Sequence, residues 1–127
     1  MKPSTMEWIE KAEADFDVVV VLRRSRKRRR YDAICFHCQQ CVEKYLKARL
    51  NEADLPLPHT HDLALLLKRC LSTEPLWVVM EMKLKFLTDF AVATRYPGEW
   101  TDRDAASEAY QTCLAFRNLA RSAFLLR

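Results

Sequence analysis

The chain has 127 residues, of which 50% are hydrophobic and 30% are charged, a balance typical of a domain with a packed core. Its single glycine excludes glycine-rich phosphate loops and argues against a hairpin-rich β fold. The longest aliphatic run covers only residues 18–22, whereas a membrane span needs about twenty residues. The acidic residues near the start are unlike a secretory signal. We therefore expect one cytoplasmic, mostly helical domain over residues 1–127.

The positive charge is concentrated in one short segment. Seven cations lie within residues 23–30, and without these seven the net charge of +4 becomes −3. Crowded cations repel one another, so a polyanion such as RNA would relieve that repulsion. The alternative is an ordinary solvated loop. The candidate polyanion-binding residues are Arg26, Lys27, Arg28, Arg29 and Arg30.

The first two predicted helices lie on either side of this basic run. Met6–Leu22 carries apolar residues at helical spacing, and Ser4 with Glu7 before it forms the S-x-x-E pattern of a capping box. A second helix is predicted from about Asp32, which can cap it, to Asn51. Its wide apolar face predicts burial on more than one flank.

Three more helices are predicted after a proline-containing link. They are a short helix capped by Thr60 or Asp62 and ending near Leu71, one from Leu76 to about Thr94 that Pro97-Gly98 stops, and one that Thr101-Asp102-Arg103-Asp104 starts. The links between the helices are short. The sequence therefore predicts an all-α fold, an up-down antiparallel bundle of about five helices, four long and one short.

A polar stripe runs along one flank of the second predicted helix. It consists of His37, Gln40, Lys44 and Lys47. One interpretation is a solvated flank in which Glu43 and Lys47 form an i,i+4 ion pair. The other is a surface for an anion or a nucleotide, extended by Arg30 at the start of the helix.

The cysteines invite a metal interpretation that the spacing does not favour. They are Cys35, Cys38, Cys41, Cys70 and Cys113. The first three read C-x-x-C-x-x-C, but on a continuous helix their side chains fan across about 120°, and no second pair with knuckle spacing exists. We interpret the thiols as small, reduced core residues and expect neither a metal nor a cofactor.

Several motifs together resemble the HEPN domain family. The main motif reads Tyr31-Asp32-x-x-Cys35-Phe36-His37-x-Gln39-Gln40-x-x-Glu43-Lys44-x-Leu46-Lys47. His61-Asp62-Leu63 follows the proline-containing link, Arg95-Tyr96-Pro97 follows the fourth helix, and Trp8, Ala12 and Asp15 fit the first helix. The resemblance extends over nearly the whole chain.

This resemblance implies a helical bundle that forms a homodimer or a higher homo-oligomer. It also implies association with a nucleotide or RNA, and a minimal nucleotidyltransferase as partner in a toxin–antitoxin-like system. On this basis the candidate ligand-binding residues are His37, Gln40, Lys44, His61, Arg95 and Tyr96, in which Arg95 would contact phosphate and Tyr96 would stack. The alternative for Arg95 is that it seals the end of its helix by pairing with Asp62 or Glu99.

Some HEPN proteins are metal-independent ribonuclease toxins that depend on an arginine and a later histidine with four to six residues between them. Only Arg30 and His37 have this spacing here, and they stand at the start of the second helix instead of in a later one. We therefore expect a non-catalytic module. The alternatives are a ribonuclease that uses Arg30 and His37, and a purely structural adaptor.

Overall fold

The structure is a computed structural model that describes residues 1–25, 30–93 and 96–126. Within these residues all regular structure is helical, with no strand. The elements are α1 (Pro3–Arg23), α2 (Arg30–Glu52), α3 (Leu63–Cys70), a 3-10 helix η1 (Pro75–Met80), α4 (Glu81–Ala93) and α5 (Arg103–Ala123). The predicted fold class, with four long helices and one short one, is confirmed.

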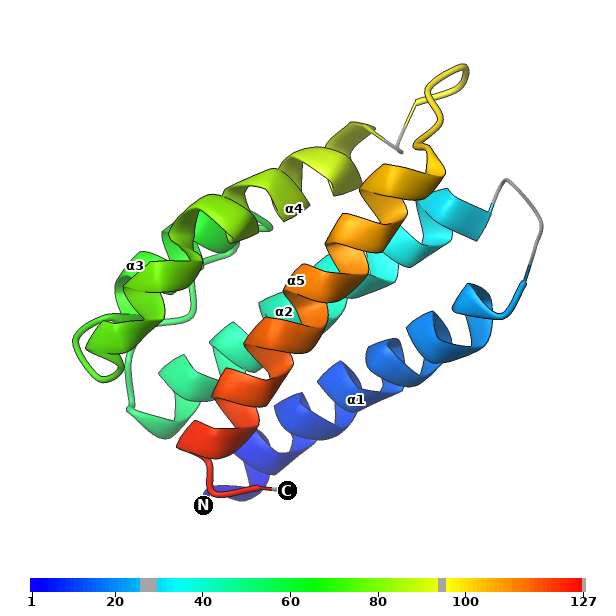
Figure 1. The fold of residues 1–127 in the computed structure, drawn as a ribbon. Coiled ribbons are helices and arrows are strands. Elements are labelled where there is room, and N and C mark those ends of the chain that lie inside the picture. Colours follow the sequence, from blue (N-terminus) through cyan, green and yellow to red (C-terminus); the bar gives the residue numbers. More distant parts are fainter. Residues whose placement is uncertain (26–29, 94–95, 127) are drawn as a thin grey trace.

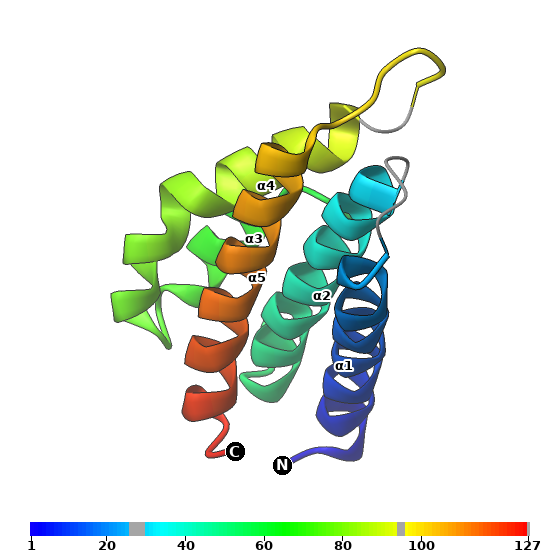
Figure 2. The same cartoon turned by 45° about the vertical axis from the view of Figure 1, so that its right-hand side comes forward.

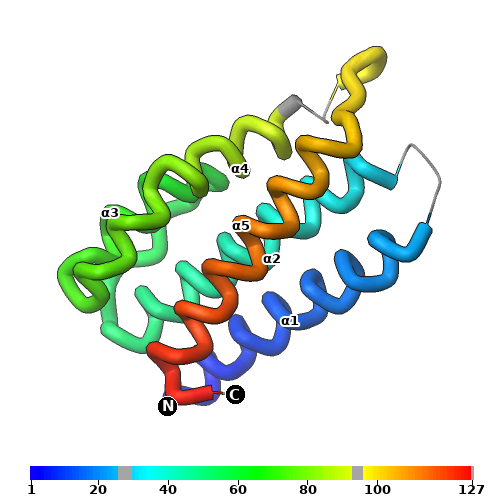
Figure 3. Tube along the Cα trace, viewed as in Figure 1, coloured from blue at the N-terminus to red at the C-terminus, as the bar shows by residue number. Residues whose placement is uncertain are grey.

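Consecutive long helices run in opposite directions, so that α1, α2, α4 and α5 form an up-down bundle (Figures 1 and 3). The central helix is α2, which contacts α1, α3, α4 and α5. Figure 2 shows α1 and α2 together on one side of the molecule and α3 with α4 on the other. Because α2 has neighbours on several flanks, its wide apolar face is buried, as its pattern predicted.

One core cluster draws side chains from every helix. Tyr45 of α2, Leu66 of α3 and Phe116 of α5 are among its largest fully buried members. Trp77 of η1 packs edge-on against Phe116, with ring centroids 5.0 Å apart. No helix in the described ranges is both long enough and apolar enough to cross a bilayer.

The start of α1 differs from the prediction. The helix begins at Pro3, because proline suits the first helical turn, and the side chain of its N-cap Lys2 makes no capping bond. Ser4 therefore lies inside the helix, where its hydroxyl accepts a hydrogen bond from Asn51 Nδ2 at 2.8 Å. The capping box predicted from Ser4 and Glu7 is wrong. Its serine instead ties the start of α1 to the end of α2.

The start of α2 also differs. The helix begins at Arg30, so Asp32 lies in its first turn and does not cap it. Oδ1 of Asp32 instead accepts hydrogen bonds from the Thr101 backbone N–H at 2.8 Å and from the Thr101 hydroxyl at 2.6 Å. This pair holds the segment before α5 against the start of α2.

The other predicted helix starts are close to those observed. Asp62 caps α3 and Asp102 caps α5 through side-chain bonds to backbone N–H groups. The predicted fourth helix is interrupted, since its beginning, Pro75–Met80, is a 3-10 helix. Pro75 at the first position suits a helix start, whereas the two adjacent β-branched valines weaken the α-helical propensity of this segment. Gly98 takes a φ of +86° in the turn before α5, a conformation that favours glycine.

Candidate functional site

The polar stripe of α2 is assembled as predicted along one flank of the helix. Its four members are all half-buried: His37, Gln40, Lys44 and Lys47. Each has a hydrogen-bond partner within the protein. Asp15 on α1 is the partner of both His37 and Lys44, whereas Gln40 and Lys47 bind Gln39 and Glu43 on α2 itself. The sequence predicted only the pairing of Lys47 with Glu43.

Asp15 of α1 connects two members of the stripe. Its Oδ1 lies 2.8 Å from His37 Nδ1, and its Oδ2 lies 2.5 Å from Lys44 Nζ. The Asp15 residue is buried, whereas the His37 side chain stays 28% exposed. One carboxylate therefore neutralises the ammonium group and orients the imidazole. In doing so it fastens α1 to the middle of α2.

Glu43 of α2 is the centre of a second cluster. Its Oε1 lies 2.8 Å from His61 Nδ1 and 3.1 Å from Gln39 Nε2, and its Oε2 lies 3.0 Å from Lys47 Nζ. Gln39 Nε2 also donates to the His61 carbonyl at 2.8 Å, and Gln40 donates to Gln39 Oε1 at 2.8 Å. This cluster fixes the segment before α3 against α2.

The electrostatics of the Glu43 cluster follow from these contacts. Burial alone would raise the pKa of the Glu43 carboxyl, but hydrogen bonds from His61, Lys47 and Gln39 outweigh burial and lower it. Glu43 is therefore held as an anion that balances the positive charge of Lys47. The His37, Gln40, Lys44 and His61 side chains named in the sequence analysis thus belong to two adjoining networks that connect α1, α2 and the α3 start.

These networks allow two kinds of chemistry. Buried carboxylates that are fully hydrogen-bonded fix the packing of helices, which is a structural role. A carboxylate at Nδ1 also orients an imidazole, as in general acid–base sites. Both His37 and His61 are held in this way. The lysines of the stripe, Lys44 and Lys47, already have carboxylate partners, so the stripe offers little unbalanced positive charge to an anion.

A third cluster was not predicted. Glu13 of α1 accepts from Arg117 Nε at 2.8 Å, from Arg117 Nη2 at 2.6 Å and from the Tyr45 hydroxyl at 2.5 Å. Arg121 Nη1 lies 3.4 Å from the same carboxylate. The only signal in the sequence was the i,i+4 spacing of the two arginines off the apolar stripe of the last helix. That spacing did not show which residue they bind.

The remaining predicted site residues lie elsewhere or outside the described ranges. Arg30 is exposed at the start of α2, and His37 follows about 10 Å further along the helix axis. Tyr96 is exposed in the segment between α4 and α5, which Thr101 ties to the first turn of α2. His61 contacts Glu43, three turns further along α2, so Tyr96 and His61 do not share one site. The residues whose structure is not described are Arg26, Lys27, Arg28, Arg29 and Arg95.

The cysteines lie in the core, in agreement with the packing interpretation. All five are buried and none forms a disulfide. Burial is the main cause that raises the pKa of Cys35 to about 11 and that of Cys70 to about 12. Cys41 and Cys113, on α2 and α5, contact each other across the core, and the pKa of each is raised. The described residues contain no group of three or more metal-ligating side chains placed to hold an ion.

Comparison with known proteins agrees with the motifs on α2 and the helical architecture. No curated protein and no solved structure gives a significant match. The profile of the HEPN domain matches residues 5–123, which span all five α-helices. The chain belongs to the HEPN domain family.

Proposed function

We propose that this HEPN protein is a non-catalytic module that binds RNA or nucleotides through the cationic end of its bundle. It self-associates and acts with a minimal nucleotidyltransferase in a toxin–antitoxin-like system. Membership of the HEPN family supports a nucleotide- or RNA-associated role. The observation that carries the proposal is the placement of charge. Arg24, the C-cap of α1, and Arg30, which begins α2, are both exposed at the same end of the bundle (Figure 1). The sequence between them adds four cations.

The non-catalytic part of the proposal is supported by the contacts of His37. Its imidazole shares the Asp15 carboxylate with Lys44, so it belongs to the junction of α1 and α2. Arg30 is separated from His37 by about two helical turns, or about 10 Å along the axis. Groups that assist at one phosphate lie within hydrogen-bond reach of it, about 3 Å. A single phosphate would not easily meet both side chains of one chain.

A ribonuclease is the second candidate, favoured by the orientation of the His37 ring on Asp15. The two candidate functions are distinguished by incubating the purified protein with RNA, once with divalent cations and once with a chelator. We expect no cleavage in either condition. Cleavage by the wild type that His37→Ala abolishes would overturn the non-catalytic proposal. The matched control is His59→Ala, because His59 is an exposed histidine outside both networks.

Binding of RNA is tested by its dependence on salt. Phosphate contacts release counterions, so the affinity for a single-stranded RNA should fall steeply as salt concentration rises. Replacing the five cations Arg26–Arg30 with glutamine should weaken binding and flatten that dependence. A control with the same net charge replaces five exposed cations elsewhere, namely Lys11, Lys68, Arg69, Lys83 and Lys85. Equal losses in the two variants would contradict a localised polyanion surface.

Self-association is supported by an apolar stripe on the outer face of η1 and α4. Leu76, Val79, Met82 and Phe86 recur there at steps of three or four residues, and all four are exposed, Leu76 by 82%. Exposed apolar patches of this kind mark association surfaces.

The nucleotidyltransferase partner is tested by co-expression with a small nucleotidyltransferase encoded beside this chain. Co-purification at a fixed ratio is expected, and its absence would contradict this partner. Partner binding without any affinity for nucleotide or RNA would identify a purely structural adaptor.

A further inference from the structure

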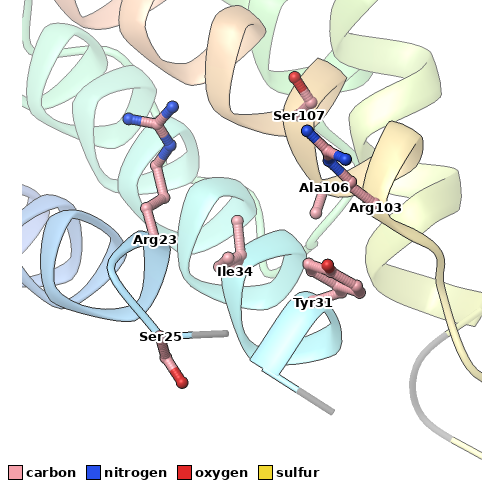
Figure 4. Close-up of a pocket in the computed structure, with 7 residues that line it drawn as sticks. All are labelled: Arg23, Ser25, Tyr31, Ile34, Arg103, Ala106 and Ser107. Atoms are coloured by element: carbon pink, nitrogen blue, oxygen red, sulfur yellow. The ribbon is translucent and has the colours of Figure 1, made fainter. Parts of the chain in front are cut away.

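A cleft opens at the end of the bundle where α1 ends and where α2 and α5 begin. It has a volume of about 580 Å³ and is lined by Arg23, Ser25, Tyr31, Ile34, Arg103, Ala106 and Ser107. Figure 4 shows Arg23 and Arg103 on opposite walls, with Ile34 and Tyr31 between them. The volume lies within the range of about 300–1,000 Å³ that is common for small-ligand sites. Arg23 begins the run of cations and Tyr31 opens the HEPN-like motif, but nothing in the sequence showed that they share a cleft with Arg103.

The two cleft arginines are exposed and differ from the half-buried cations of the bundle in having no carboxylate partner among the described residues. Lys44, Arg49 and Arg117, for example, each contact a carboxylate. Within the described ranges, neither Arg23 nor Arg103 forms an ion pair. The cleft therefore contains two guanidinium groups whose charge no acidic side chain of this region neutralises.

Neighbouring groups hold Arg23 in place and donate hydrogen bonds to the acidic side chains nearby. The guanidinium carbon of Arg23 lies 3.6 Å from the centroid of the Tyr110 ring, which itself stacks on Phe16. Stacking fixes the plane of a guanidinium and leaves the N–H groups at its edge available for a ligand. Asp32 accepts from Thr101, and Asp102 accepts from a backbone N–H of α5. These bonds direct the Asp32 carboxylate toward the backbone and hydroxyl of Thr101, and the Asp102 carboxylate toward the backbone of α5.

The rest of the lining is suited to a flat, partly apolar group. Tyr31 is half-buried and packs against the core, while Ile34 and Ala106 are buried. The Ser107 hydroxyl adds a polar group on the wall that carries Arg103. Two planar guanidinium groups recognise phosphate oxygens by paired hydrogen bonds, and an aromatic ring beside them offers a stacking surface for a base.

We propose that this cleft binds the 5′-phosphate of a nucleotide, with the phosphate between Arg23 and Arg103 and the base against Tyr31. The nucleotide is either free or the first residue of an RNA. This inference rests on the proposed nucleotide or RNA association and adds a defined site to it, separate from the α2 stripe.

The experiment measures the affinity of the full chain for four probes at constant salt. The probes are a nucleoside 5′-monophosphate, the matching nucleoside, a short RNA with a 5′-phosphate and the same RNA with a 5′-hydroxyl. Either phosphorylated probe should bind about tenfold or more tightly than its unphosphorylated partner, as hydrogen bonds to a charged group require. Preference for the monophosphate identifies a free nucleotide, and preference for the RNA identifies an RNA end.

The variants test the cleft itself. Arg103→Gln should remove most of the preference for the 5′-phosphate, and Arg23→Lys should weaken it because lysine lacks the planar guanidinium. Arg103 has no ion pair to lose in the described chain, so its substitution should leave the thermal unfolding temperature unchanged. Arg69→Gln is the matched control, since Arg69 is an exposed arginine on α3 that lines neither the cleft nor the cationic end of the bundle.

Two results would overturn the inference. Binding that is indifferent to the 5′-phosphate in both pairs of probes, or a preference for the 5′-phosphate that Arg103→Gln and Arg69→Gln weaken equally, would exclude the cleft while leaving the proposed RNA association intact. Failure of all four probes to bind the wild-type chain would remove both the cleft site and the proposed function.

Discussion

Arg117 in the last helix donates two hydrogen bonds to Glu13 in the first, from Nε to Oε2 at 2.8 Å and from Nη2 to Oε1 at 2.6 Å. The two residues are 104 positions apart. Paired bonds of this geometry are the strongest that arginine makes with a carboxylate. They fasten α5 to α1, and Tyr45 of α2 donates to the same carboxylate. Glu13 therefore joins three helices at one point.

Replacing Glu13 with glutamine should destabilise the bundle. Arg117 would keep its charge but lose its partner in a partly buried place, and the Tyr45 hydroxyl would lose a charged acceptor. We expect the free energy of unfolding to fall by about 1–3 kcal/mol. Urea unfolding checks this value, with Glu10→Gln as an exposed control on the same helix. A loss no larger than that of the control would show that the cluster contributes little to stability.

Acid should weaken the fold through Glu13 and Glu43. Burial alone would raise the pKa of each carboxyl, but hydrogen bonds from Arg117 and Tyr45 lower that of Glu13, and bonds from His61, Lys47 and Gln39 lower that of Glu43. The folded state therefore binds these protons more weakly than the unfolded chain. The resulting stabilisation is complete above the ordinary pKa of 4.5 and is lost as the pH falls through the lowered values.

The measurement is the free energy of urea unfolding as a function of pH. The wild type should lose stability steadily below about pH 4.5, and the double variant Glu13→Gln with Glu43→Gln should lose less over the same range. Glu7→Gln, an exposed substitution on α1, should follow the wild type. Identical pH dependence in all three proteins would contradict the assignment of these two carboxyls.

The thiols should be unreactive while the protein is folded. All five cysteines are buried, and the raised pKa values of Cys35, Cys41, Cys70 and Cys113 disfavour the nucleophilic thiolate. A chromogenic disulfide reagent should label none of them rapidly in buffer and all five in guanidinium chloride. Rapid labelling of one thiol in buffer would identify a part of the core that opens more readily than its packing indicates.

The apolar stripe on η1 and α4 should control self-association. Val79 and Met82 are 72% and 62% exposed, so charged replacements there should not disturb the core. We expect Val79→Glu together with Met82→Glu to convert an oligomer into a monomer, measured as mass by light scattering. Val21→Glu is the control, because Val21 is 65% exposed but lies on α1. An unchanged mass in the double variant would exclude this stripe as the interface.

Much of the fold could be predicted because helices are encoded locally. The repeat of apolar residues shows which face of a helix is buried, and capping bonds join residues close in sequence, as Asp62 does with Ala64. The ion pair of Glu43 with Lys47 was predictable for the same reason. The capping box at Ser4 was wrong because the helix begins earlier, at Pro3, so that Ser4 lies inside it and binds the distant Asn51 instead.

The candidate site was only partly predictable. The stripe of α2 and its flank were visible in the sequence, but the two carboxylates that neutralise it, Asp15 and Glu43, were not recognised as partners of His37 and His61. Nothing in the local pattern places Arg23 near Arg103, because they belong to helices at opposite ends of the chain.

The sequence by itself therefore determined the helices, their buried faces and the concentration of positive charge between the first two, since each depends on residues a few positions apart. Only the tertiary structure decided which cations are neutralised and which remain available to a ligand. Ion pairing requires contact within about 4 Å, and that contact between distant residues exists only after the helices have packed.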